Sequence, residues 1–157
     1  MNKLIILLSV MLFTSFYTYS QNTIRFNWDN YGMTFNAPIN FMVEKETAEE
    51  FVAKLPNDNL NLSIIPWKNN ALTSENLHNS LRDLCLELGY SISEIGTIRS
   101  LNLNSYESYY VDVTKGSMNL IIQVLLDKNN DTHFYNVIVY TPKFKNEALD
   151  IAASFSH

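Results

Sequence analysis

The sequence predicts an α+β domain: an antiparallel sheet with helices packed on it. Four segments with alternating apolar residues follow one another between residues 98 and 140, separated only by short polar turns, which is the pattern of an antiparallel meander. One segment with helical apolar spacing precedes this meander and another follows it. Both are apolar along one side only, so each predicted helix needs a flat apolar surface to lie on.

The chain begins with a segment that is typical of a secretory signal peptide. Lys3 supplies a positive charge, Leu4 to Phe13 is an almost uninterrupted apolar run, and Thr18-Tyr19-Ser20 has the small residues of a cleavage site. The run is shorter than the roughly 20 apolar residues that a membrane-spanning helix needs. We therefore expect residues 1–20 to be removed and residues 21–157 to form a single domain, periplasmic or secreted. The intact mass of that protein should correspond to a chain that begins at or near Gln21.

Alternating apolar residues predict the strands of the first half of the chain. One strand is expected over Met33 to Ala37. Two further segments, Phe51 to Leu55 and Leu60 to Ile64, flank the turn Pro56-Asn57-Asp58-Asn59, which predicts a hairpin. The acidic segment from Glu44 to Glu50 lies before this hairpin and is interpreted as a solvated connection.

Start and stop signals delimit the two predicted helices. The first begins after the hydroxyl and acidic residues Thr73-Ser74-Glu75 and ends at Gly89. The second begins at Thr141-Pro142, an N-cap residue followed by proline. The apolar stripes are Leu77, Leu81, Leu84, Cys85 and Leu88 in the first, and Phe144, Ala148, Ile151 and Phe155 in the second.

The meander consists of four predicted strands. They cover Ile98 to Leu103, Tyr106 to Thr114, Met118 to Leu126 and Phe134 to Tyr140. The third is apolar on one side and mixed on the other, so we place it near the middle of the sheet.

Tyrosines in the second meander strand supply the candidate binding residues. Tyr109, Val111 and Val113 share one side of the strand, which is expected to face the core. Tyr106 and Tyr110 share the other side with polar neighbours and are expected to be at least partly exposed. Together with Trp67 they form a predicted partner-binding surface, because tyrosine and tryptophan are enriched at such surfaces. Ordinary sheet surface, or cover by a helix, is the alternative for these side chains.

Composition excludes several classes of protein. Eleven Lys+Arg against 16 Asp+Glu give a net charge of −5, which disfavours nucleic acid and anionic membrane as partners. The content of 46% hydrophobic and 13% aromatic residues excludes disorder. Cys85 is the only cysteine, so an internal disulfide and a multi-cysteine metal site are both excluded.

Three short segments of the sequence resemble sequences of the PsbP-like superfamily. These are Gly32-Met33-Thr34-Phe35-Asn36-Ala37-Pro38, Asn104-Ser105-Tyr106 before a tyrosine-rich strand, and Ile151-Ala152-Ala153-Ser154-Phe155. The resemblance covers about Tyr31 to Ser156, although the tryptophan that many members carry after the proline is absent and Phe41 stands nearby. That superfamily includes photosystem II extrinsic proteins, a Ran-binding import factor and exported bacterial proteins. The resemblance implies a binding or scaffold module and brings no shared catalytic residues.

Catalytic and metal motifs are weak or missing in the sequence. The segment Asp127 to Asp131 copies the first half of a calcium loop, but Thr132 replaces the required glycine and Ile138 the required glutamate. Cys85 and His78 lie seven residues apart on one predicted helix, about 10 Å, which is too far for a Cys–His nucleophile. Cys85 is instead interpreted as a buried apolar residue. We therefore predict no catalytic residues, no metal and no cofactor.

Three functions remain compatible with the sequence. The preferred one is an exported, non-enzymatic binding or scaffold domain whose partner is a protein or an envelope component. The second is a small-molecule or lipid carrier with an apolar groove between sheet and helix. The third is a hydrolase with dispersed acids, such as those of Glu44 to Glu50 or the pair Glu107 and Asp112, which lie on opposite sides of one strand.

Overall fold

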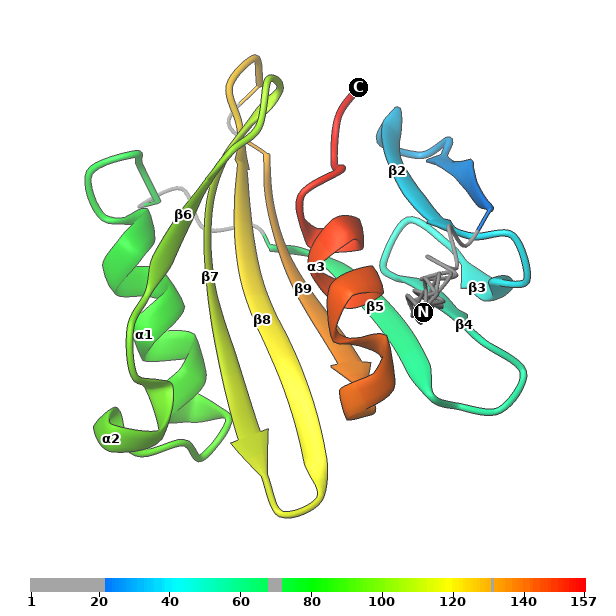
Figure 1. The fold of residues 1–157 in the computed structure, drawn as a ribbon. Helices are drawn as coiled ribbons and strands as arrows, with labels where there is room; N and C mark the ends of the chain where they lie inside the picture. The colour runs from blue at the N-terminus through cyan, green and yellow to red at the C-terminus, as the bar shows by residue number, and fades with distance from the viewer. Residues whose placement is uncertain (1–21, 68–71, 131) are drawn as a thin grey trace, which may run out of the picture.

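The computed structural model describes residues 22–67, 72–130 and 132–157; the predicted signal peptide lies outside the described residues. The elements follow one another in the order strands, helices, strands, helix (Figure 1). Their bounds are β1 (Thr23–Trp28), β2 (Met33–Pro38), β3 (Met42–Glu46), β4 (Phe51–Lys54), β5 (Leu60–Trp67), α1 (Leu77–Glu87), α2 (Ile92–Ile95), β6 (Arg99–Asn102), β7 (Tyr106–Lys115), β8 (Met118–Asp127), β9 (His133–Tyr140), the 3-10 turn Pro142–Phe144 and α3 (Lys145–Ala152).

The strands form a seven-stranded antiparallel sheet and a separate pair. The large sheet has the order β3-β4-β5-β9-β8-β7-β6, and the small one pairs β1 with β2. The predicted hairpin β4–β5 and the predicted meander β6 to β9 are therefore confirmed, and β8 lies between β7 and β9 as expected. The pairing of β5 with β9 joins the two halves of the chain into one sheet.

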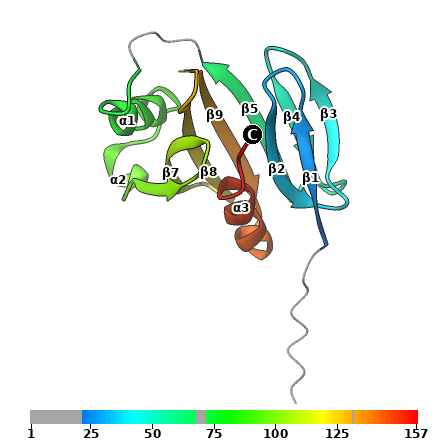
Figure 2. The same cartoon turned by 90° about the horizontal axis from the view of Figure 1, so that it is seen from above.

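Helices lie on both faces of the large sheet, which confirms the predicted α+β class. On one face α3 and the β1–β2 pair cover the central strands, and on the other α1 and α2 pack on β7 and β8 (Figures 1 and 2). Each face has its own buried cluster. Trp28, Phe35 and Phe134 belong to the first, and Leu81, Cys85 and Val111 belong to the second.

The last residues of the chain connect the small sheet to the large one. Thr34 and Ser156 exchange backbone hydrogen bonds of 2.7 and 2.9 Å in an isolated antiparallel bridge. Arg25 Nη2 donates to Thr34 Oγ1 at 2.6 Å and to Ser156 Oγ at 3.1 Å. Phe155 lies beyond the end of α3 but is buried, so the apolar stripe predicted for that helix continues into this bridge.

The predicted helix boundaries are close to the observed ones. Asn76 is the N-cap residue of α1, and the backbone N–H of Thr73 donates to Asn76 Oδ1 at 2.7 Å. Gly89, with φ of 84°, follows the C-cap residue Leu88, as expected for a glycine that ends a helix. Thr141 and Pro142 start a 3-10 turn that leads into α3.

Two strands were absent from the sequence prediction. In β1 the alternating residues Phe26 and Trp28 point to the core beside Phe35 and Met33 of β2. In β3 all five side chains are exposed, so no burial alternation marks the strand, and the region predicted as a solvated connection is instead a sheet edge.

Candidate functional site

The prediction that Tyr106 and Tyr110 are exposed is wrong. Tyr106 is 0% exposed and Tyr110 is 8% exposed. The prediction assumed that the two helices would leave this side of β7 open, but they lie on opposite faces of the sheet. Tyr106 and Tyr110 share the cluster that contains α3 residues, and Val111 and Val113 share the cluster of α1. The two tyrosines therefore belong to the core.

The segment predicted to resemble a calcium loop is a structured turn. Asp127 is 2% exposed, and its Oδ2 lies 2.8 Å from His157 Nε2. Its Oδ1 accepts a 2.7 Å hydrogen bond from the backbone of Asn129, so the carboxylate serves the turn and the chain end. Asp131 lies outside the described residues, and in the remainder no group of three or more His, Cys, Asp and Glu side chains is arranged to hold a metal.

Trp67, the third predicted binding residue, borders a part of the sheet that bears no helix in the described ranges. On the side of α1, the strands β9, β5 and β4 extend beyond that helix (Figure 2). The strand registers place nine side chains on this half-sheet, and all are partly exposed. We call them the open sheet face: Val52, Lys54, Asn61, Ser63, Ile65, Trp67, Tyr135, Val137 and Val139.

Aromatic and branched apolar side chains make up most of the open sheet face. The rings of Trp67 and Tyr135 meet edge to face, with centroids 6.2 Å apart. Tyr135 is paired with Ile65 and Val137 with Ser63, so neighbouring strands present these residues side by side. An antiparallel sheet that turns one side to water usually carries polar residues there. The apolar character of this side therefore makes it the candidate binding surface.

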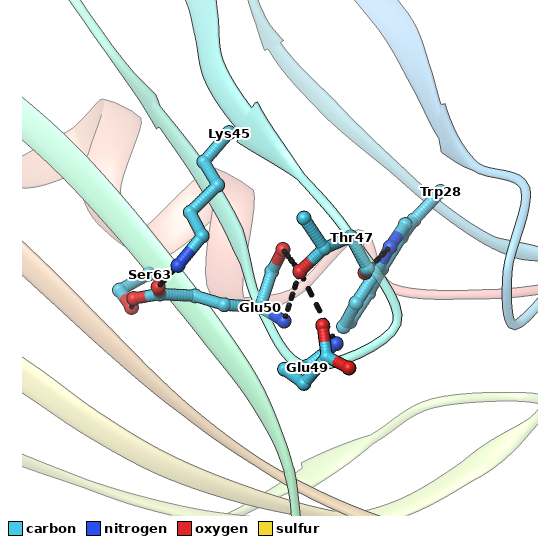
Figure 3. Close-up of polar contacts among 6 residues, drawn as sticks. All are labelled: Trp28, Lys45, Thr47, Glu49, Glu50 and Ser63. Atoms are coloured by element: carbon cyan, nitrogen blue, oxygen red, sulfur yellow. Dashed lines mark hydrogen bonds and ion pairs between the residues drawn. The ribbon is translucent and has the colours of Figure 1, made fainter.

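A polar network fixes one border of the open sheet face (Figure 3). Glu50 binds Lys45 Nζ at 2.8 Å through Oε2, and its Oε1 accepts a 3.3 Å hydrogen bond from Ser63 Oγ. Thr47 Oγ1 accepts hydrogen bonds from the backbone N–H groups of Glu49 and Glu50, both at 3.2 Å. Trp28 Nε1 donates to the Thr47 carbonyl oxygen at 3.0 Å, which ties this turn to the core.

The charge of Glu50 acts on the groups around it. The hydrogen bond from Lys45 lowers the pKa of the Glu50 carboxyl and raises the pKa of the Lys45 ammonium, so both stay charged at neutral pH. Burial, and then the negative charge of Glu50, raise the pKa of Tyr135. Tyr135 therefore presents a neutral phenol on the open sheet face.

The open sheet face combines apolar contact area with a few polar groups. Its side chains offer contact area, the amide of Asn61 and the hydroxyls of Ser63 and Tyr135. Asn61 Oδ1 is buried and accepts no hydrogen bond in the described structure. Sequence reasoning identified Trp67 but missed Tyr135, Val137 and Val139. Their alternation was visible in the sequence, but it did not show which side of β9 would stay uncovered.

Cys85 is a buried apolar residue, as predicted. It is 0% exposed within the apolar stripe of α1, and burial raises the pKa of its thiol to about 11. At pH 8 only about one thiol in a thousand would be a thiolate, the reactive form.

We expect Cys85 in the native protein to react slowly with thiol reagents, whereas the same residue in denaturant reacts at once. Cys85→Ala should lower the free energy of unfolding by about 1 kcal/mol, since little volume is removed, and should leave binding unchanged. Absorbance-monitored labelling and denaturant titration measure the two effects. Fast labelling of the folded protein would contradict the buried assignment.

The interface where a carrier would need its groove is filled by side chains. Leu77, Leu81 and Leu84 of α1 pack with Val111 and Ile122 of the sheet, all of them buried. A cavity of about 160 Å³ lies at the other side of α1, towards α2. It is smaller than the roughly 300 Å³ typical of pockets that enclose a small molecule.

Comparison with solved structures identifies the fold. No family model and no curated protein matches the sequence. A structure from Bacteroides thetaiotaomicron matches 87% of this chain at 13% identity with a TM-score of 0.52, and this chain spans 48% of that protein. Cyanobacterial PsbP from Synechocystis matches 87% of this chain and 92% of its own at 12% identity, with a TM-score of 0.58. The Saccharomyces cerevisiae Ran-binding protein Mog1p matches 87% and 96% at 9% identity, with a TM-score of 0.55.

The chain has a PsbP/Mog1-like fold. The fold expected from the resemblance in the sequence is thus confirmed. At these identities the likeness concerns the fold alone, and functions are not transferred with it. In this PsbP/Mog1-like chain, no helix among the described residues is long and apolar enough to cross a membrane.

Proposed function

We propose that this chain is an exported, non-enzymatic binding module that recognises a protein or envelope component through the open sheet face. The observation that carries the proposal is the half-sheet on which no helix of the described residues lies, with Trp67, Tyr135, Ile65, Val137 and Val139 partly exposed side by side. Contiguous apolar patches with a polar border are typical of interaction sites. The leader sequence supports export.

The Mog1-like fold favours a protein as the partner. Mog1p is named as a Ran-binding protein, so this fold serves protein recognition in at least one case. The rigid border of the open sheet face favours the same class. Because Glu50 is held by Lys45, Ser63 and the Thr47 turn, little side-chain ordering remains to be done when a partner binds.

The test is partner capture by the folded, mature chain and by Val137→Glu. Val137 lies at the middle of the open sheet face, paired with Ser63 and Ile122, and a carboxylate there would be desolvated by any partner. We expect at least a thirtyfold loss of affinity, equivalent to about 2 kcal/mol. Capture from native envelope extract identifies the partner, and titration with that purified partner gives the affinity.

Ile39→Glu is the matched control. Ile39 is 54% exposed and lies just after β2, in the layer on the opposite side of the sheet. It receives the same chemical change but should bind the partner as the unmodified chain does. Thermal midpoints of both variants establish that they are folded. Equal binding by the unmodified chain and a folded Val137→Glu variant would exclude the open sheet face as the recognition surface.

A further inference from the structure

A groove lies between α1 and α2, away from the open sheet face. The groove has a volume of about 160 Å³. One side comes from α1 and the other from α2 and the residues before β6. Its lining residues are His78, Arg82, Ile92, Ile95, Gly96 and Ile98.

The charge at this groove is the guanidinium of Arg82. Within the described part of the chain, Arg82 forms no ion pair and no hydrogen bond of its side chain. His78 precedes Arg82 by one helical turn, so both side chains lie on the same side of α1. The acid nearest in α2, Glu94, is engaged elsewhere, since it accepts hydrogen bonds of 2.7 and 2.6 Å from the backbone N–H and the hydroxyl of Ser91. In a protein of net charge −5, this groove therefore carries a cation that no described acidic side chain pairs with.

The rest of the groove is aliphatic. Ile95 is 4% exposed and forms part of the buried cluster under α1, whereas Ile92 is 72% exposed and stands at the rim. The His78 ring packs edge to face against Tyr109 at 5.5 Å, which holds it in place. A guanidinium and an imidazole at one end of an isoleucine-lined groove complement a ligand with an anionic head and a short hydrocarbon tail.

We propose that the α1–α2 groove binds a small aliphatic carboxylate. Arg82 binds the carboxylate through its paired N–H groups, and Ile92, Ile95 and Ile98 enclose the hydrocarbon part. The volume of about 160 Å³ corresponds to roughly five water molecules at about 30 Å³ each, which fits an acid of four to five carbons. This site is independent of partner recognition through the open sheet face.

The experiment titrates 3-methylbutanoate into the folded mature chain and follows backbone amide resonances. We expect saturable shifts confined to residues 78–82 and 92–98, with a dissociation constant on the order of 1 mM for so small a ligand. The uncharged isostere 3-methylbutanamide should bind at least tenfold more weakly. Arg82→Gln should weaken the carboxylate at least tenfold and remove most of the difference between the two ligands.

Lys143→Gln is the control for general charge effects. It removes one positive charge from the exposed turn before α3, on the opposite face of the sheet, and should leave the titration unchanged. Three results would overturn the proposal: shifts that do not saturate, equal binding of acid and amide, or unchanged binding by Arg82→Gln. The experiment measures ligand-induced shifts at α1 and α2, so its outcome does not depend on the outcome of partner capture.

Discussion

Trp28→Ala is expected to lower the free energy of unfolding by about 3 to 5 kcal/mol, the range for deleting a large buried aromatic side chain. Trp28 is 0% exposed, and its ring meets Tyr31, Phe51 and Phe134 at centroid distances of 4.6, 5.9 and 6.0 Å. These contacts join the small sheet to strands β4 and β9 of the large sheet. Removing the ring therefore opens a cavity between the two sheets.

The second tryptophan of the chain provides the matched control. Trp67 is partly exposed and lies outside the buried clusters, so Trp67→Ala should cost clearly less than Trp28→Ala. Trp28→Phe keeps most of the apolar contact but loses the bond to the Thr47 carbonyl oxygen, and should fall between the two alanine variants. Denaturant unfolding followed by far-UV circular dichroism suits all three, because the signal does not depend on tryptophan. Similar losses for Trp28→Ala and Trp67→Ala would contradict the burial described for Trp28.

Gln123→Leu is expected to lower the free energy of unfolding by about 3 kcal/mol, although leucine is the more apolar residue. Gln123 lies 0% exposed at the centre of the large sheet. Its Nε2 donates to Ser108 Oγ and to the Ala152 carbonyl oxygen, both at 2.9 Å, and its Oε1 accepts from Asn136 Nδ2 at 3.1 Å. The substitution therefore leaves a buried amide unpaired and frees the end of α3 from the sheet.

A double-mutant cycle separates these hydrogen bonds from the loss of packing. Asn136 Oδ1 already lacks a hydrogen-bond partner in the described structure, so the amide depends on Gln123. Gln123→Leu combined with Asn136→Leu should cost less than the sum of the two single variants, because the second change removes the group that the first leaves unpaired. Ser108→Ala should cost only about 1 kcal/mol. Additive losses in the cycle would show that the two side chains are not coupled.

The parts of the fold that could be predicted are those where local pattern and burial agree. In the meander and in α1, apolar residues recur at regular spacing, and recognisable turn or cap residues mark both ends. In β3 the pattern is absent, because all five side chains of this edge strand are exposed. The strand is held by backbone pairing with β4 and buries no alternate side chains. In β1 the alternation of Phe26 and Trp28 was present, but the strand pairs only with β2 and follows the predicted signal peptide closely in the sequence.

The candidate site could be predicted only in part for a related reason. Strand alternation shows which residues share a side, and it placed Tyr106 and Tyr110 together correctly. It does not show which element covers that side, and α3 with the β1–β2 pair covers it here. Trp67 was found from its residue type, whereas Tyr135 joins it through the register of β5 with β9, two strands far apart in the sequence.

The pairing of β5 with β9 also governs how quickly the native sheet can form. Within β3 to β5, and within β6 to β9, each strand pairs with a sequence neighbour, so these strands can form hairpins locally. Leu60 can pair with Tyr140 only after the intervening chain has closed into a long loop. The entropy of that closure is lost before the contacts repay it, which slows folding in proteins rich in distant pairings. We therefore expect the two halves to form first, and their docking along β5 and β9 to limit the folding rate. Until that step is complete, β5 and β9 are unprotected edges on which another copy of the chain can add.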